Sequence, residues 1–188
     1  QIVPDATLGT EASVVTPNAS VDGNPATLIE GGAMRGANLF HSFQEFNANS
    51  FESVYFNPPG NVENILSRVT GNNISNIDGL LGVNGSANLF LLNPNGIVFG
   101  ENARLDIGGS FVASTAESVR FANGTSFSTV EPEAPLLTVN VPVGLQFGSD
   151  PGAISNRSQA NNPNALPSLD PRLPLPESSG LGVVPGQF

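Results

Sequence analysis

Short apolar runs separated by turn-forming dipeptides constrain the fold of this chain most strongly. Asn84-Gly85, Asn95-Gly96, Gly108-Gly109 and Asn123-Gly124 follow one another at intervals of about 11 to 15 residues. This spacing fits strands of about five residues joined by tight turns. Glycine and proline number 21 and 16, and lysine is absent, so strong helix formers are scarce. The pattern predicts an all-β fold.

Alternation within the runs predicts which side chains face the core. Two stretches, 103–107 and 118–121, alternate apolar and polar residues, as half-buried strands do. The side chains expected to face inward are Ala103, Leu105, Ile107, Val119 and Phe121. Those expected to face water are Arg104, Asp106, Ser118 and Arg120. The run Leu89-Phe90-Leu91-Leu92 is apolar on both faces, which predicts a strand covered on both sides.

One segment has helical spacing, with Val62, Ile65, Leu66 and Val69 at i, i+3, i+4 and i+7. The run is about ten residues long before Gly71, and helices this short are marginal. We therefore expect a strand from Ile65 to Thr70.

A tetrapeptide recurs in the chain. Ala37-Asn38-Leu39-Phe40 reappears 50 residues later as Ala87-Asn88-Leu89-Phe90. One coil of a β-solenoid takes roughly 20 to 25 residues, so the repeat fits equivalent positions two coils apart. A chance repeat is the alternative.

The charge balance and two scarce residue types exclude several functions. Sixteen carboxylates oppose six arginines, for a formal net charge of −10. Such a chain repels phosphate backbones and anionic lipids, which argues against nucleic-acid and membrane-surface binding. With no cysteine and one histidine, thiol chemistry, thiolate zinc sites and two-histidine metal sites are excluded. We expect no metal, no cofactor and no small-molecule substrate.

No residue stands in a catalytic pattern. His41 lies among Phe40, Phe43 and Phe46, which favours a packed histidine, and no serine stands in a nucleophile-elbow context. A polysaccharide-cleaving solenoid would need clustered acids, whereas the acids here are scattered singly. The sequence 131–133, Glu-Pro-Glu, fits an exposed turn. We expect no enzymatic activity.

The composition changes near Pro151. From Ser155 to Pro185 the chain is rich in Asn, Ser and Pro, which is typical of an extended segment. The chain turns apolar again from Leu181. We expect a folded domain over 1–154, and over 155–188 an Asn/Ser/Pro-rich extended segment that leads into the next coil of a longer protein.

The most distinctive motif is Asn93-Pro94-Asn95-Gly96-Ile97. Proline, asparagine and glycine in this order suit a tight turn, because glycine accepts a positive φ. The motif belongs to an ordered series of similar elements along the chain. The others are Leu39-Phe40-His41-Ser42-Phe43, Phe46-Asn47, Val69-Thr70-Gly71, Ala87–Leu92 and Asp106–Thr115. This series resembles the filamentous-haemagglutinin/haemolysin secretion domain of two-partner secretion (TPS), from about Ala6 to Ser155.

The resemblance implies a right-handed parallel β-helix with an N-terminal cap and extra-helical β elements. It implies the secretion-signal domain of a large exoprotein of adhesin or haemolysin type, which acts as a monomer and templates β-helix folding during export. The implied partner is an outer-membrane barrel transporter whose periplasmic POTRA domains recognise the chain. The exoprotein would be secreted or surface-bound, through the periplasm of a diderm bacterium, after removal of a signal peptide.

The resemblance also carries over residue roles. Asn93, Pro94, Asn95, Gly96 and Ile97 match the family's secretion motif. The family-like structural positions are Asn38, Leu39, His41, Phe43, Phe46, Asn47, Val69, Thr70 and Gly71. A second family motif, Asn-Pro-Asn-Leu, is altered here to Asn57-Pro58-Pro59-Gly60, so we transfer no transporter contact from that loop. A surface module that binds glycans or host receptors is the alternative function, and exposed aromatic rows would favour it.

Overall fold

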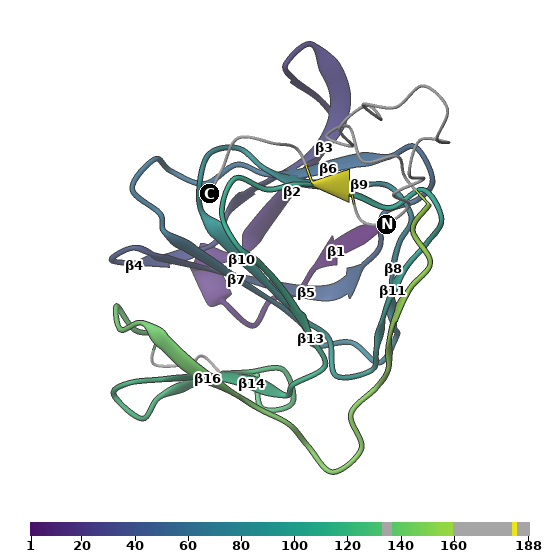
Figure 1. The fold of residues 1–188 in the computed structure, drawn as a ribbon. Coiled ribbons are helices and arrows are strands. Elements are labelled where there is room, and N and C mark those ends of the chain that lie inside the picture. Colours follow the sequence, from purple (N-terminus) through teal and green to yellow (C-terminus); the bar gives the residue numbers. More distant parts are fainter. Residues whose placement is uncertain (133–136, 160–181, 184–188) are drawn as a thin grey trace, which may run out of the picture.

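The computed structural model describes residues 1–132, 137–159 and 182–183. These residues form eighteen β-strands and one short 3-10 helix, η1 (Gly9–Glu11). Most of the strands wind into a solenoid with three parallel sheets, one on each face (Figure 1). The expected all-β parallel solenoid is confirmed.

The second, third and fourth coils each contribute one strand to each face, and the first coil contributes a strand to sheets A and B only. Sheet A is built on β5 (Asn38–Phe46), β7 (Asn64–Val69), β10 (Asn88–Leu92) and β13 (Phe111–Ser114). Sheet C contains β8 (Ser75–Ile77), β11 (Ile97–Phe99) and β17 (Ile154–Asn156). Sheet B contains β6 (Ser53–Phe56), β9 (Leu80–Val83), β12 (Arg104–Asp106) and β18 (Gly182–Val183). In the first coil, Ala48 makes an isolated bridge to Ile77 in place of a sheet C strand.

The register of sheet A explains the repeated tetrapeptide. Asn38 pairs with Asn64, and Asn64 pairs with Asn88, so the two copies lie two coils apart. The first coil spans 26 residues and the second spans 24. The strand expected over Ile65 to Thr70 is also confirmed, as β7. β7 pairs with β5 on one side and β10 on the other, so its backbone groups find partners in both neighbouring strands.

The core fills the solenoid interior with the inward side chains of all three sheets. Ala103, Leu105 and Ile107 are buried there, as the alternation predicts, while Arg104 is exposed. Each additional coil extends this continuous apolar column, since no single coil can bury its inward face alone.

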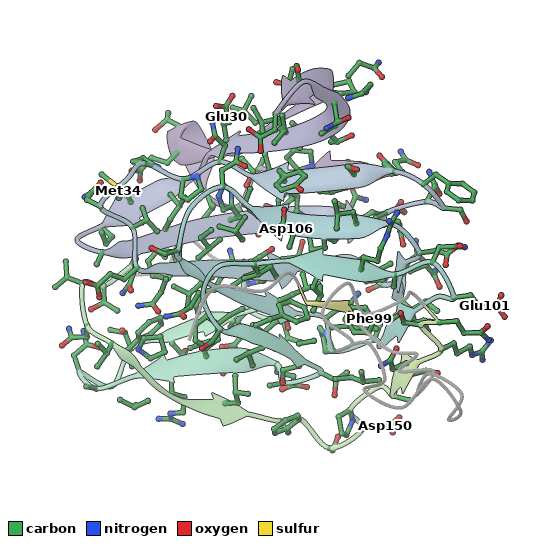
Figure 2. The ribbon with its side chains drawn as sticks, turned by 45° about the horizontal axis from the view of Figure 1, so that its top comes forward. Glu30, Met34, Phe99, Glu101, Asp106 and Asp150 are labelled. Carbon is green, nitrogen blue, oxygen red and sulfur yellow. The ribbon has the colours of Figure 1, made fainter. Side chains whose placement is uncertain are left out.

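Antiparallel strands cover the N-terminal end of the solenoid. β1 (Ile2–Pro4) and β4 (Ala33–Arg35) pair with β5, and β2 (Ser13–Val21) pairs with β3 (Asn24–Gly31), which continues sheet B. Figure 2 shows the coils as layers with this purple hairpin above them. Antiparallel strands stop the stack because they do not continue its parallel pairing. The N-terminal cap that the resemblance implies is thus formed by β1 to β4.

A small antiparallel sheet lies outside the solenoid (Figure 1). This sheet D contains β14 (Ser118–Phe121), β15 (Ser126–Ser128) and β16 (Pro142–Gln146), in the order β15-β14-β16. Val119, Phe121 and Phe127 pack against the outer face of sheet A, and the Phe40 and Phe127 rings lie 5.0 Å apart, edge to face.

Sheet D explains two features of the sequence. β10 is covered on both faces as predicted, because Leu89 and Leu91 face the interior while Leu92 faces sheet D. The prediction that Ser118 faces water is wrong. β14 is central in sheet D and is paired on both sides, so even its small polar side chain is enclosed.

The fourth coil is interrupted by sheet D. The chain leaves the solenoid after β13, forms sheet D, and returns at Gly152 to complete the coil with β17 and β18. The division at residue 154 stays a prediction, and most of 155–188 lies outside the described residues.

Candidate functional site: the corner between sheets A and C

Most of the residues predicted from the sequence lie at one corner, where the chain turns from sheet A to sheet C. The first coil places Phe46 and Asn47 there, and the second coil places Val69, Thr70 and Gly71 there. The third coil contributes Asn93-Pro94-Asn95-Gly96-Ile97, between β10 and β11. These elements are distant in sequence, but successive coils stack them above one another.

Asn93 is fully buried and holds the corner together through its side chain. Its Nδ2 donates to the Asn73 backbone oxygen and to Ser75 Oγ, both at 3.0 Å, in the preceding coil. Its Oδ1 accepts a hydrogen bond from the Asn95 backbone N–H at 3.0 Å, which closes an Asx turn. The Gly96 N–H donates to the Asn93 carbonyl at 3.1 Å and completes the turn. One side chain thus fixes both the turn and its contact with the coil below.

The motif also binds the chain that returns from sheet D. Gly152 N–H donates to the Pro94 carbonyl at 2.8 Å, and Ile97 N–H donates to the Ala153 carbonyl at 3.1 Å. Gly96 has a φ of 130° and lies against Ala153, so a side chain there would be strained and crowded. Ile97 itself is fully buried in the core. The motif therefore connects the second, third and fourth coils.

Gly71 and Thr70 continue the corner in the second coil. Asn95 Nδ2 donates to the Gly71 carbonyl at 2.8 Å. A Cβ on Gly71 would lie 2.1 Å from the Gln44 carbonyl oxygen, so only glycine fits. Thr70 Oγ1 donates to Asp5 Oδ2 at 2.6 Å, which ties this corner to the N-terminal cap.

Most of the family-like positions in β5 face the interior, where Leu39, Phe43 and Phe46 belong to the core. His41 is buried, its ring lies against Phe43 and Phe56, and its Nδ1 lies 3.0 Å from Ser13 Oγ. Burial lowers the pKa of His41 to about 3, so the imidazole is neutral. The packed interpretation of His41 is confirmed.

Asparagines form a ladder along sheet A. Asn64 Nδ2 donates to Asn38 Oδ1 at 3.1 Å, and Asn88 Nδ2 donates to Asn64 Oδ1 at 3.0 Å. The ladder ends where Asn88 Oδ1 accepts the Ser110 N–H. Each asparagine amide group thus forms a hydrogen bond with the amide group of the next coil, and these bonds fix the register of the coils.

The altered loop Asn57-Pro58-Pro59-Gly60 follows β6. Asn57 Nδ2 donates to Glu30 Oε1 at 2.8 Å, and Asn57 Oδ1 accepts from Asn84 Nδ2 at 3.1 Å. This asparagine therefore has a structural role between coils, whereas Pro58 is half-buried and Pro59 is exposed.

A buried polar network, which the sequence analysis missed, joins the cap, the coils and sheet D. Arg68 is fully buried in β7, and its guanidinium donates to Ser42 Oγ, Thr7 Oγ1 and the Ser128 carbonyl at 2.9, 2.8 and 2.6 Å. The guanidinium carbon also lies 4.3 Å from the centre of the Phe127 ring. A charged residue in a strand expected to be buried was the available signal.

Asp5 supplies the opposite charge of this network. Burial alone would raise the pKa of Asp5, but hydrogen bonds from Thr7, Thr70 and Ser42 outweigh it and lower the pKa. Burial lowers the pKa of Arg68 to about 10, and the Asp5 carboxylate opposes that shift. Both groups are therefore charged at neutral pH, so the network holds a cation and an anion that share hydroxyl partners.

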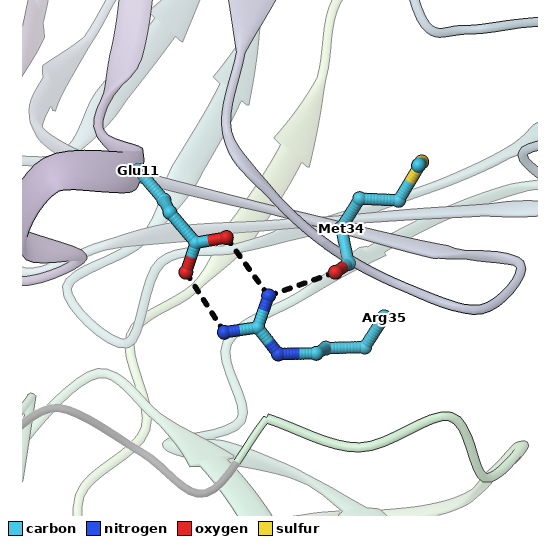
Figure 3. Close-up of polar contacts among 3 residues, drawn as sticks. All are labelled: Glu11, Met34 and Arg35. Atoms are coloured by element: carbon cyan, nitrogen blue, oxygen red, sulfur yellow. Dashed lines mark hydrogen bonds and ion pairs between the residues drawn. The ribbon is translucent and has the colours of Figure 1, made fainter.

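An exposed ion pair lies near the cap (Figure 3). Both guanidinium nitrogens of Arg35 contact the Glu11 carboxylate, at 2.9 and 2.8 Å, and one also donates to the Met34 carbonyl. The Arg35 contact lowers the pKa of Glu11. Such an exposed pair contributes little to stability, so it links η1 to β4 without anchoring the fold.

The described residues offer no centre for metal chemistry and no membrane span. In residues 1–132, 137–159 and 182–183, no three His, Asp or Glu side chains group to hold a metal ion. None of the described residues forms a helix with the length and apolarity needed to cross a bilayer.

Comparison with known proteins agrees with this architecture. The TPS secretion domain profile matches residues 1–187. The chain belongs to the TPS secretion domain family. It is 30% identical over 129 residues to the heme/hemopexin-binding protein of Haemophilus influenzae. That alignment covers 66% of this chain and 14% of the relative. No solved structure matches the chain.

Family membership identifies the kind of protein to which this chain belongs. TPS exoproteins are large proteins that are secreted or exposed at the surface through the outer membrane, and the family implies an outer-membrane transporter as partner. The chain spans about one seventh of the length of the curated relative that it matches.

Proposed function

We propose that this domain is recognised in the periplasm by the POTRA domains of its outer-membrane transporter, and then templates β-helix folding as the exoprotein is exported. The leader peptide is removed before recognition, and the domain acts as a monomer without enzymatic activity. The match over nearly the whole chain supports a transporter partner.

The observation that carries the templating step is the difference between the two ends of the solenoid. Antiparallel strands β1, β4 and β2 cover the first end. At the other end, within the described residues, sheets A, C and B finish on β13, β17 and β18, all in parallel register. Unpaired edges of parallel strands accept further strands in the same register. The open end is thus suited to receive the next coil.

Burial then favours outward movement of the chain. Each coil added to the open end removes inward apolar side chains from water, at about 25 cal/mol per Å². A coil that has folded outside the cell resists moving back through a narrow pore. This supplies a direction for export without ATP or a proton gradient.

The secretion motif has a structural part in this proposal. Asn93 to Ile97 connect three coils, so the motif acts by allowing the template to form. To test this, Asn93 and Asn95 are replaced by Ala in the full-length exoprotein, and the exported protein is quantified. We expect export to fall strongly, whereas Asn24→Ala, at the exposed start of β3, should leave it unchanged. Unchanged export of the double variant would refute the role of the motif.

The alternative, a module that binds glycans or host receptors, lacks a supporting surface. Within the described part of the chain, Phe51 and Phe147 are the exposed aromatic side chains, and they lie on separate elements. Tyr55 is half-buried and donates its hydroxyl to Asp106 at 2.6 Å. A glycan array probed with the purified domain would detect such binding.

A further inference from the structure

One stretch of the chain has a strand pattern that the core does not use. From Thr138 to Phe147 no residue is charged, and every second residue is a large apolar one. These five side chains, named here the apolar row, are Val139, Val141, Val143, Leu145 and Phe147. Their exposed fractions range from 36% to 66%.

The apolar row is unusual in this molecule. Elsewhere, alternating apolar residues such as Leu105 and Ile107 fill the interior, or, like Val119 and Phe121, pack between sheets A and D. In the row, the same alternation faces water. Exposed contiguous apolar surface is uncommon in soluble domains and marks interaction sites. We therefore attribute the alternating apolar residues of the row to contact with a partner, since they do not pack in the core.

The backbone of β16 (Pro142–Gln146) is also available for pairing, whereas the carbonyls of Thr138 and Asn140 already accept hydrogen bonds from Asn38 Nδ2. β16 occupies the edge of sheet D, with β14 on one side and, within the described residues, no strand on the other. An edge strand presents unpaired N–H and C=O groups that accept an added strand. Backbone and side chains thus offer the two components of strand addition, hydrogen bonds and an apolar face.

Charge at one end of the row defines the partner further. The Glu117 carboxylate lies against Gly148, directly after Phe147, and the exposed Asp150 follows two residues later. The matching strand carries apolar residues on one face and a Lys or Arg at the end beside these carboxylates. A second copy of this chain fits poorly, because two domains of net charge −10 repel each other.

We propose that β16, with Val141 and Phe147 on either side of it, is the docking strand of this domain, and that it pairs with a β-strand of the transporter's periplasmic domain. This rests on the proposed function, and it names the segment that the transporter reads. Val143, Leu145 and Phe147 take no part in the core, so β16 and the residue after it offer the same apolar face before and after the domain folds. The transporter could therefore recognise this strand in either the unfolded or the folded domain.

The test uses matched pairs of lysine substitutions at exposed positions. Val143→Lys/Leu145→Lys places charge on the row, and Val14→Lys/Phe51→Lys places the same charge on the cap and a distant loop. Circular dichroism confirms that both variants fold. Binding of each to the purified periplasmic domain of the transporter is measured by surface plasmon resonance, and a synthetic peptide of residues 138–150 is measured alongside.

We expect the row variant to bind at least tenfold more weakly than wild type, the control to differ less than twofold, and the peptide to bind. Equal binding of the row variant, or failure of the peptide to bind, overturns the docking strand. Dimerisation that the row variant abolishes, with transporter binding intact, also overturns it. Export of the full-length exoprotein with and without the transporter tests the proposed function separately, since transporter-independent export would refute that function alone.

Discussion

Acidification should destabilise the domain through His41, the one imidazole in the chain. The folded state lowers the pKa of His41 to about 3, against an unfolded value of 6.5. Between these values the unfolded chain binds a proton that the folded domain rejects. Stability is therefore complete above about pH 6.5 and falls as the pH drops towards 3.

The size of this effect follows from the two pKa values. At pH 5, the imidazole of the unfolded chain is almost fully protonated, and that of the folded domain is neutral. Linkage then predicts a loss of about 2 kcal/mol in the free energy of unfolding between pH 7 and pH 5. The lowered pKa values of Asp5, Glu11 and Asp78 act at lower pH, because the ordinary values of these carboxyl groups are 3.8, 4.5 and 3.8.

Urea unfolding followed by far-ultraviolet circular dichroism at pH 7, 6 and 5 measures the loss. The control is His41→Gln, which keeps a hydrogen-bonding group towards Ser13 but cannot titrate. We expect this variant to be less stable at pH 7 and to lose little further stability by pH 5. If wild type and variant show the same dependence on pH, His41 is not the group responsible.

Two further substitutions test the network and the corner. Arg68→Met should cost about 1–3 kcal/mol, because it removes the hydrogen bonds that the buried guanidinium donates to Ser42, Thr7 and Ser128, whereas Arg104→Met at an exposed position should change the unfolding midpoint little. Gly71→Ala should cost about 1–3 kcal/mol through the clash with Gln44, whereas Gly60→Ala, which meets no atom within 4 Å, should be neutral or slightly stabilising. A stable Arg68→Met variant, or equal midpoints for the two glycine variants, would contradict these arguments.

The features that sequence alone predicted are those that depend on local pattern. The strand at β7, the two covered faces of β10 and the inward side chains from Ala103 to Ile107 follow from alternation and length. The repeated tetrapeptide gave the coil spacing because the asparagine ladder needs the same residue at equivalent positions. Stacking of the motif beneath Gly152 could not be predicted, since it depends on where the chain returns to the solenoid.

The misjudged and missed features arise from contacts distant in sequence. Ser118 is buried because β15 and β16 flank it, and no local pattern indicates which strands will pair. Arg68 is satisfied by Thr7, Ser42 and Ser128, which come from three separate parts of the chain. Only the folded topology shows that a charged residue in a buried strand has partners.

The interrupted fourth coil has a consequence for the order of assembly. The Pro94 carbonyl accepts a hydrogen bond from Gly152 N–H, and Ile97 N–H donates to the Ala153 carbonyl. Both partners lie more than fifty residues further along the chain. A polypeptide delivered from its amino end can close its first two turns early, but the third stays half-bonded until the detour through sheet D has been delivered. The third coil can therefore complete its hydrogen bonds only after the chain through residue 153 has been exported, and later coils can stack only after that.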